Sequence, residues 1–119
     1  MDTIVVGIDF SKSSLTAMKV SIDIAARANA DLHIVWVETV EMPYDKAEEK
    51  LKEYANKAKE KLNNSEAYYH ILPKGKVYLI LNKAIKEFDA DLLVVGTHGN
   101  SGYDEKFAGA NTYKTITEA

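Results

Sequence analysis

The chain has 119 residues, of which 46% are hydrophobic, and it carries a net charge of −3 and no cysteine. This length fits a single domain, residues 1–119, that buries a core without disulfides or metals. The missing cysteines exclude disulfides, iron–sulfur clusters and cysteine nucleophiles, and the acidic balance argues against a general nucleic-acid binder. No apolar run approaches the roughly 20 residues that span a bilayer, and no leader pattern opens the chain, so we expect a cytoplasmic protein.

The first third of the chain alternates short apolar runs with a helical pattern. Residues 3–8 and 32–37 are apolar and rich in β-branched side chains, which is typical of strands covered on both faces. The stretch "DFSKSS" after the first run is a turn whose serines can cap a helix. Apolar residues at helical spacing then form one face, made by Leu15, Met18, Ile22 and Ala25.

The same alternation continues along the rest of the chain. The pattern predicts a helix over 45–62, a strand over 67–72, a helix over 77–90, a strand over 91–95 and a last helix from about Gly109. The apolar face of the helix over 77–90 is predicted to consist of Leu79, Ile80, Ala84, Ile85 and Phe88. Strands that alternate with helices predict an α/β fold, an open parallel sheet with helices on both faces.

Ligands of such sheets bind beyond the carboxyl ends of the strands, where the winding direction reverses. The residues that follow the strands are therefore the candidates for a site, and these are Asp9, the region after Val37, and Gly96 onward. Asp9 has two interpretations: a carboxylate beside a ligand, accepting from a sugar hydroxyl or a base amine, or a turn residue bonded to the backbone of "SKSS".

The segment "VVGTHGNSGYDEKFAGANT", residues 94–112, leads from the fourth predicted strand into a glycine-bearing loop. Glycines after a strand allow close approach of a ligand, and successive backbone N–H groups suit phosphates. Gly96, Gly99 and Gly109 do not have the spacing of the dinucleotide or P-loop motifs, so an irregular turn is the alternative.

The chain resembles the universal stress protein family along nearly all of its length. The stretch "IVVGIDFSKSSLTAMKVSIDIAARANADLHIVWV" is similar to the family's opening strand, Asp-x-Ser-x-x-Ser turn, helix and second strand. "DADLLVVGTHGNSGYDEKFAGANT" is similar to its signature of Gly, two residues, Gly, nine residues, Gly and then Ser or Thr. Gly96, Gly99 and Gly109 match that spacing.

The resemblance implies a Rossmann-like fold that binds an adenine nucleotide, ATP in many members and usually with a divalent ion such as Mg²⁺ or Mn²⁺. It implies that Asp9 contacts the adenine or ribose and that the backbone near Val37 contacts the base. Gly96 and Gly99 would lie near the ribose and phosphates, and Gly109 and the residues after it, Ala110, Asn111 and Thr112, near the phosphate tail. It also implies a homodimer.

The chain departs from the family pattern in three places. Ala110 stands where the signature has Ser or Thr, which removes one hydroxyl donor to phosphate; Asn111 and Thr112 are the candidates to replace it. Asp104 and Glu105 place negative charge in the loop, where they either repel phosphate, face solvent or help to hold a cation. The chain ends at "TITEA", so we expect the family's fifth strand to be missing and the fourth strand to form an exposed edge.

The remaining polar residues do not form a catalytic pattern. His33 and His70 lie on predicted strands without metal-ligand spacing, so packing or edge roles are favoured, and Trp36 is interpreted as a core residue. No Ser–His–Asp or paired-carboxylate arrangement can be inferred, which argues against a dedicated enzyme beyond slow ATP hydrolysis. The sequence predicts a regulatory stress-response module that binds ATP. The alternative is a nucleotide-free interaction module that self-associates or accepts a strand from a partner.

Overall fold

The computed structural model describes residues 1–97 and 111–116, with side chains through residue 96. Five strands form one parallel sheet in the order β3-β2-β1-β4-β5. The strands are β1 (Thr3–Ile8), β2 (Asp31–Val37), β3 (Ala67–Leu72), β4 (Leu92–Thr97) and β5 (Asn111–Ile116). The helices are α1 (Lys12–Ala28), α2 (Tyr44–Lys61) and α3 (Val77–Phe88). The predicted α/β architecture with helices on both faces is confirmed.

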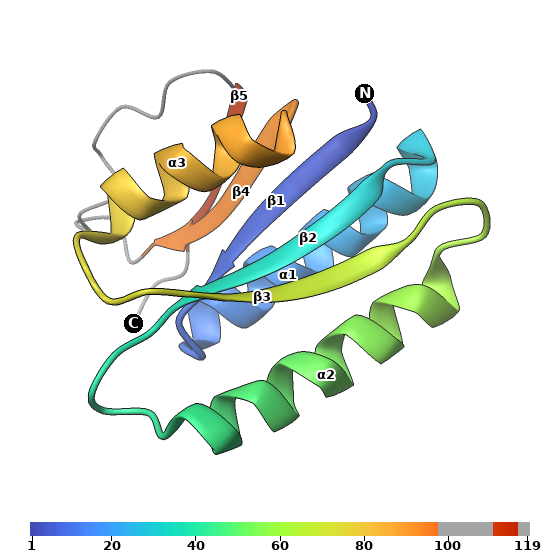
Figure 1. Ribbon diagram of the computed structural model, residues 1–119. Coiled ribbons are helices and arrows are strands. Elements are labelled where there is room, and N and C mark those ends of the chain that lie inside the picture. The colour runs from blue at the N-terminus through green and yellow to red at the C-terminus, as the bar shows by residue number, and fades with distance from the viewer. Residues whose placement is uncertain (98–110, 117–119) are drawn as a thin grey trace.

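The described helices cover the two faces of the sheet unequally, with α1 and α2 on one face and α3 on the other (Figure 1). Side chains of a strand alternate between faces, so each strand supplies both cores. The larger core lies under α1 and α2 and contains Trp36. Trp36 is 1% exposed, which confirms the prediction that it is a core residue. The smaller core lies under α3 and consists of Val5, Val35, Leu81, Ile85, Ala90, Leu93 and Val95.

The start of α1 is defined by its serines. Ser11 is the N-cap, and its hydroxyl accepts a hydrogen bond from the backbone N–H of Ser14 at 3.2 Å. The Ser14 hydroxyl in turn donates to the Ser11 carbonyl at 3.0 Å. The predicted capping role of this turn is thus confirmed, and it fixes where the helix begins relative to the end of β1.

The C-terminal part of the chain corrects two predictions. No helix occupies Asn111–Ile116; these residues form β5, which pairs in parallel with β4 from Asn111 opposite Leu92 to Ile116 opposite Thr97. The fifth strand is therefore present, and β4 is paired on both sides rather than exposed. The residues "NTYKTI" include threonine, tyrosine and isoleucine, types that favour strands, and the unpaired edge of β4 supplies the hydrogen-bonding partners.

The apolar face of α3 also differs from the prediction at two positions, Leu79 and Leu81. Leu81, Ala84 and Ile85 are buried against the sheet, whereas Leu79 is 52% exposed. The helix is rotated so that Leu81 meets β1 and Leu79 faces outward. None of the helices in the described part of the chain is long and apolar enough to cross a membrane.

Candidate nucleotide site

The turn after β1 holds Asp9 in a defined place. One oxygen of its carboxylate, Oδ1, accepts a hydrogen bond from the backbone N–H of Ser11 at 2.9 Å. The backbone N–H of Asp9 donates to the hydroxyl of Ser14 at 3.3 Å. The turn interpretation of Asp9 is therefore correct, and it leaves the side chain exposed at the carboxyl end of β1. Because one oxygen is used in the turn, the carboxylate is oriented and Oδ2 remains available to accept from a ligand.

Phe10 holds this turn in an uncommon backbone conformation. Its φ of 65° lies in the left-handed region, which side chains with a Cβ rarely adopt. The ring is anchored in the larger core, with its centroid 5.7 Å from that of Trp36 and 6.2 Å from that of Tyr54. The Lys50 ammonium lies 5.6 Å from the ring centroid. Packing of the ring thus opposes the backbone strain and keeps Asp9 at the strand end.

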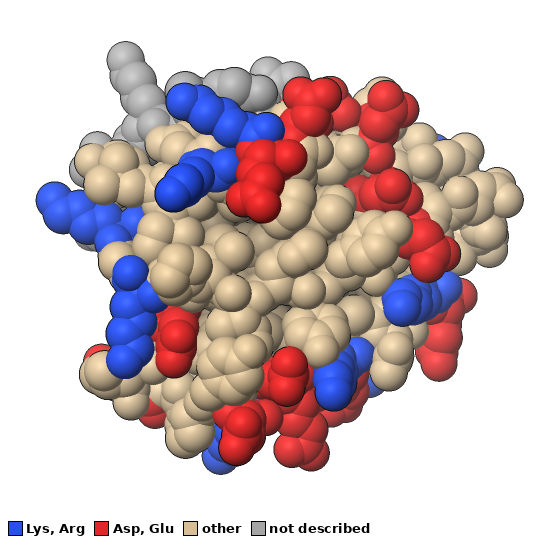
Figure 2. All heavy atoms as spheres, viewed as in Figure 1, with Lys and Arg blue, Asp and Glu red and all other residues tan. Residues whose placement is uncertain are grey.

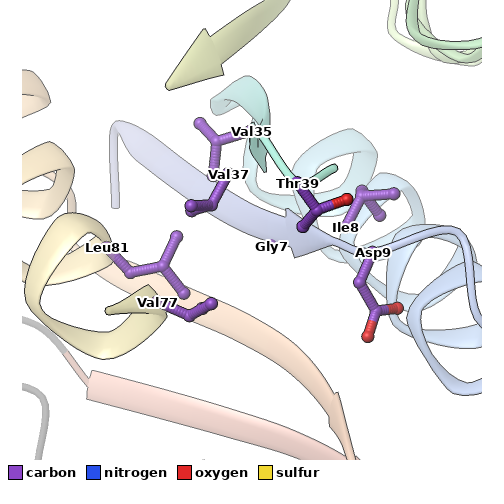
Figure 3. Close-up of a pocket in the computed structure, with 8 residues that line it drawn as sticks. All are labelled: Gly7, Ile8, Asp9, Val35, Val37, Thr39, Val77 and Leu81. Carbon is purple, nitrogen blue, oxygen red and sulfur yellow. The ribbon is translucent and has the colours of Figure 1, made fainter. Parts of the chain in front are cut away.

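A pocket opens beside Asp9 at the carboxyl ends of β1 and β2, under the first turns of α3 (Figure 3). Its volume is about 40 Å³, well below the range of sites that enclose a small molecule, so it is a small recess in the surface. The side chains of Val35 and Val37 from β2 face those of Val77 and Leu81 from α3 across this space (Figure 3). The full lining is Gly7, Ile8, Asp9, Val35, Val37, Thr39, Val77 and Leu81.

This lining has the chemistry for a flat, largely apolar group with a polar rim. The four aliphatic side chains cover two opposing walls, and Gly7 leaves the floor open because it has no side chain. A Cβ at Gly7 would lie 3.3 Å from Cδ1 of Leu81 and 3.5 Å from Cγ1 of Val95, so a larger residue there would fill space beside the pocket. The apolar walls suit contact with the face of an aromatic base laid against the recess, and the Asp9 carboxylate and Thr39 hydroxyl supply hydrogen-bonding groups at its edge.

Two of the site residues predicted from the sequence, Asp9 and Val37, line this one pocket. Gly96 lies in β4 on the opposite face of the sheet, against the start of α1. A Cβ there would lie 2.2 Å from the carbonyl oxygen of Ser13. The absence of a side chain at Gly96 is thus required by the close approach of α1, whatever the residue does for a ligand.

Asn111 and Thr112 do not lie near the pocket. They pair with Leu92 and Leu93 at the amino end of β4, whereas Asp9 and Val37 lie at the carboxyl ends of their strands. At about 3.3 Å per residue, the first and last residues of a six-residue strand are about 16 Å apart. Gly99, Gly109 and Ala110, with Asp104 and Glu105, lie outside the described residues.

Six pocket residues were not predicted from the sequence: Gly7, Ile8, Val35, Thr39, Val77 and Leu81. Gly7 and Val35 could have been found from the sequence, because every second residue of a strand lies on the same face of the sheet, and in β1 and β2 these two residues lie on the face that α3 covers. No pattern in the sequence predicts how α3 is rotated about its axis, and it is this rotation that brings Val77 and Leu81 to the pocket.

A second polar cluster lies at the other end of α3 from the pocket. Nδ1 of His33 and Nε2 of His70 are 2.8 Å apart, and the Phe88 ring lies over both imidazoles, with centroid distances of 4.4 and 4.5 Å. The packing role predicted for the two histidines is thus observed. Burial is the main cause that lowers the pKa of each histidine; for His33 the charge of His70 lowers it further, and Asp31 opposes this. Within the described residues, no group of three or more His, Asp or Glu could hold a metal ion.

We expect the protein to lose stability as the pH falls below about 6.5, the ordinary value for histidine. Because the pKa of both histidines is lower in the folded chain, the unfolded chain takes up protons first, so acid favours unfolding until the folded pair also titrates. Urea unfolding between pH 8 and pH 5 measures this. The double variant H33Q/H70Q should show a flatter profile. An equally steep profile in that variant would assign the acid sensitivity to groups other than the two histidines, whose pKa values Asp31 and Glu87 raise through their charges.

Comparisons with known proteins agree with this fold. The model of the universal stress protein family matches residues 1–119. A universal stress family protein from Burkholderia pseudomallei has a TM-score of 0.80 at 19% identity, with 98% of this chain and 96% of that chain covered. A universal stress protein in complex with cAMP has a TM-score of 0.65 at 26% identity, with 98% and 96% covered.

The universal stress protein from Archaeoglobus fulgidus in complex with dAMP has a TM-score of 0.73 at 19% identity, with 98% of this chain and 97% of that chain covered. No curated protein matches the chain. The family model spans the whole chain. The chain belongs to the universal stress protein family.

Proposed function

We propose that this chain binds an adenine nucleotide in the pocket between β1, β2 and α3, and that it acts as a regulatory stress-response module of a single domain rather than as an enzyme. The observation that carries the proposal is the pocket itself, where Val37 forms part of one of two aliphatic walls and Asp9 lies at the edge. Two similar structures, those with cAMP and with dAMP, have adenine nucleotides bound, which supports the same ligand class here.

Each part of the pocket has a role in this proposal. The base lies between the valines of β2 and the first turns of α3, and the backbone near Val37 contacts its edge. Asp9 accepts from a ribose hydroxyl through the carboxylate oxygen that the turn leaves available. The phosphates extend toward the segment that begins after Gly96, with Gly99, Gly109 and Ala110 as the proposed contacts. Asn111 and Thr112 lie at the far end of β4, and this disfavours them as phosphate ligands.

The number of phosphates is the finer part of the proposal. The family signature favours ATP, whereas Ala110 lacks the hydroxyl that would help to hold a phosphate tail. One missing hydrogen bond to a charged group weakens binding by about 1.5–3 kcal/mol, roughly tenfold to a hundredfold. We therefore expect the preference for ATP over AMP to be small. Isothermal titration of nucleotide-stripped protein with ATP, AMP and cAMP, with and without Mg²⁺ or Mn²⁺, measures it.

A tryptophan at position 77 should abolish most of the binding. Val77 lines the pocket and is 37% exposed, so a larger side chain fills the pocket from its mouth without overpacking the core. We expect V77W to bind ATP at least tenfold more weakly than the parent. The matched control is L79W on the same helix, where the parent leucine is 52% exposed and does not line the pocket.

The titrations separate the possible outcomes. If V77W binds as tightly as L79W, the pocket is not the site. If titration of the parent protein with millimolar ATP, AMP or cAMP produces no heat of binding, the leading account becomes the alternative, a nucleotide-free interaction module. One argument for that alternative was a missing fifth strand, and this argument no longer holds because β5 is present. The edges of the described sheet, on β3 and β5, are where we propose that copies of the chain associate, in the cytoplasm.

A further inference from the structure

The sheet register brings the two histidines of β2 and β3 together although they are 37 positions apart in the sequence. His33 is opposite Tyr68, and Val35 is opposite His70, so the two imidazoles are diagonal neighbours. Both point to the α3 face, because Val35 between His33 and Val37 shares their side of the sheet. Their positions in the sequence show no ligand pattern, and only the pairing of the strands creates the cluster.

The two rings meet edge to edge. Their planes are inclined by only 18°, and their centres are 5.0 Å apart. This separation nearly equals the 2.8 Å between the facing nitrogens plus the radii of the two rings, so both nitrogens lie near the line that joins the centres. The lone pair of one ring and the N–H of the other therefore point directly at each other in nearly the same plane.

We propose that His33 and His70 form a binding site for a borderline transition-metal ion, Zn²⁺ or Cu²⁺, which takes the place of the proton that the two rings share. Neutral imidazole is a preferred ligand of both ions. The site is distinct from the proposed nucleotide pocket, which lies at the opposite end of α3.

Binding of the ion requires the two rings both to separate and to turn. With metal–nitrogen bonds of about 2.0–2.1 Å in tetrahedral geometry, the two nitrogens must be roughly 3.3 Å apart. They are 2.8 Å apart in the hydrogen-bonded pair, so the rings need to separate by about half an ångström. Each ring must also turn by roughly 35°, because the two nitrogens face each other in the pair and must both point at the ion. The shared proton leaves, and the ring that carried it takes up another on its outer nitrogen, so a neutral pair binds the ion without net release of protons.

The surroundings favour a cation and orient its ligands. The negative charge of Asp31 acts on His33, and that of Glu87 acts on His70. Figure 2 shows acidic side chains gathered at the upper right of this face, near the start of β1 and the C-terminal end of α3, beside a surface largely free of charge. Phe88 lies over both imidazoles and holds the rings in a common plane. Water completes the coordination of the ion, and a two-histidine site of this kind binds more weakly than a closed structural zinc site.

The test is a metal titration of the metal-stripped full-length chain at pH 7.5. We expect one equivalent of Cu²⁺, and less tightly of Zn²⁺, to bind and raise the melting temperature, whereas Mg²⁺ has no effect because it prefers oxygen ligands. H33Q and H70Q should each weaken binding at least tenfold. The matched control is H98Q, which removes the third histidine of the sequence and should bind like the parent.

Nuclear magnetic resonance of the parent protein keeps the test independent of how well the variants fold. Long-range ¹H–¹⁵N spectra should show Zn²⁺ moving the signals of Nδ1 of His33 and Nε2 of His70 together, with a single midpoint. The proposal is overturned if these signals do not move at millimolar Zn²⁺. It is also overturned if H33Q and H70Q, shown to be folded by circular dichroism, bind Cu²⁺ as tightly as the parent.

Discussion

Replacing Gly96 by alanine is expected to destabilise the protein by about 3 kcal/mol or more, because the new Cβ would overlap backbone rather than a movable side chain. The Cβ would lie 2.2 Å from the carbonyl oxygen of Ser13, 2.3 Å from its carbon and 2.8 Å from the nitrogen of Ser14. These atoms belong to the first turn of α1, which the Ser11 cap holds in place. Relief of the overlap therefore requires α1 to move away from β4 or β4 to bend. Urea unfolding followed by circular dichroism measures the loss.

Gly75 provides the matched control for this substitution. A Cβ there would lie 2.7 Å from Cδ1 of Ile80, which is the far end of a flexible side chain, and Gly75 itself is exposed. We expect G75A to change stability by less than about 1 kcal/mol, as is usual for a surface substitution. Equal stability of G96A and G75A would show that α1 and β4 are not in close contact at Gly96.

The same substitution also bears on the candidate site. Ser14, which the new Cβ would displace, receives a hydrogen bond from the backbone of Asp9 and belongs to the turn that orients its carboxylate. G96A should therefore weaken nucleotide binding even though Gly96 lies on the other face of the sheet from the pocket. Weak binding by a glycine variant in the family signature is thus not by itself evidence that the glycine contacts phosphate.

Replacing Trp36 by alanine is expected to cost about 3–5 kcal/mol, the usual range for a large aromatic side chain removed from a core. Trp36 is 1% exposed and is among the largest of the fully buried side chains in the described residues. It also contacts the Phe10 ring, at 5.7 Å between centroids and 56° between planes. Its loss therefore removes both buried surface and a support of the strained turn that carries Asp9. Urea unfolding measures the first effect, and nucleotide titration of the folded fraction measures the second.

A double-mutant cycle of F10A and W36A isolates the contact between the rings, which we expect to contribute about 0.5–1.5 kcal/mol beyond burial. F10G should be more stable than F10A by about 1 kcal/mol, because glycine adopts a φ of 65° without steric conflict. If F10A proves at least as stable as F10G, the turn stores no strain at this position. The core packing of Trp36 would then remain the sole source of the effect of W36A.

The alternation of the sequence identified β1 to β4 and all three described helices because their patterns are strong locally. Buried parallel strands read as short apolar runs, and α1 and α2 have apolar stripes at helical spacing. The strand β5 was missed because "NTYKTI" is short and partly polar, and it becomes a strand only when it pairs with the edge of β4. The face of α3 was misassigned at Leu79 and Leu81, since its many apolar residues allow several rotations about the helix axis.

The sequence by itself determined the family, the parallel sheet and the places of Asp9 and Val37, because a residue that follows a buried parallel strand must lie at the carboxyl edge of the sheet. Tertiary structure alone decided which residues meet there and elsewhere. It closed the pocket with Val77 and Leu81 from α3, the third element after β2, and it required a glycine at position 96 by bringing α1 against β4. It also brought His33 of β2 within hydrogen-bond distance of His70 on the neighbouring strand β3. Contacts between distant segments depend on register and on helix rotation, and no local pattern of residues specifies either of these.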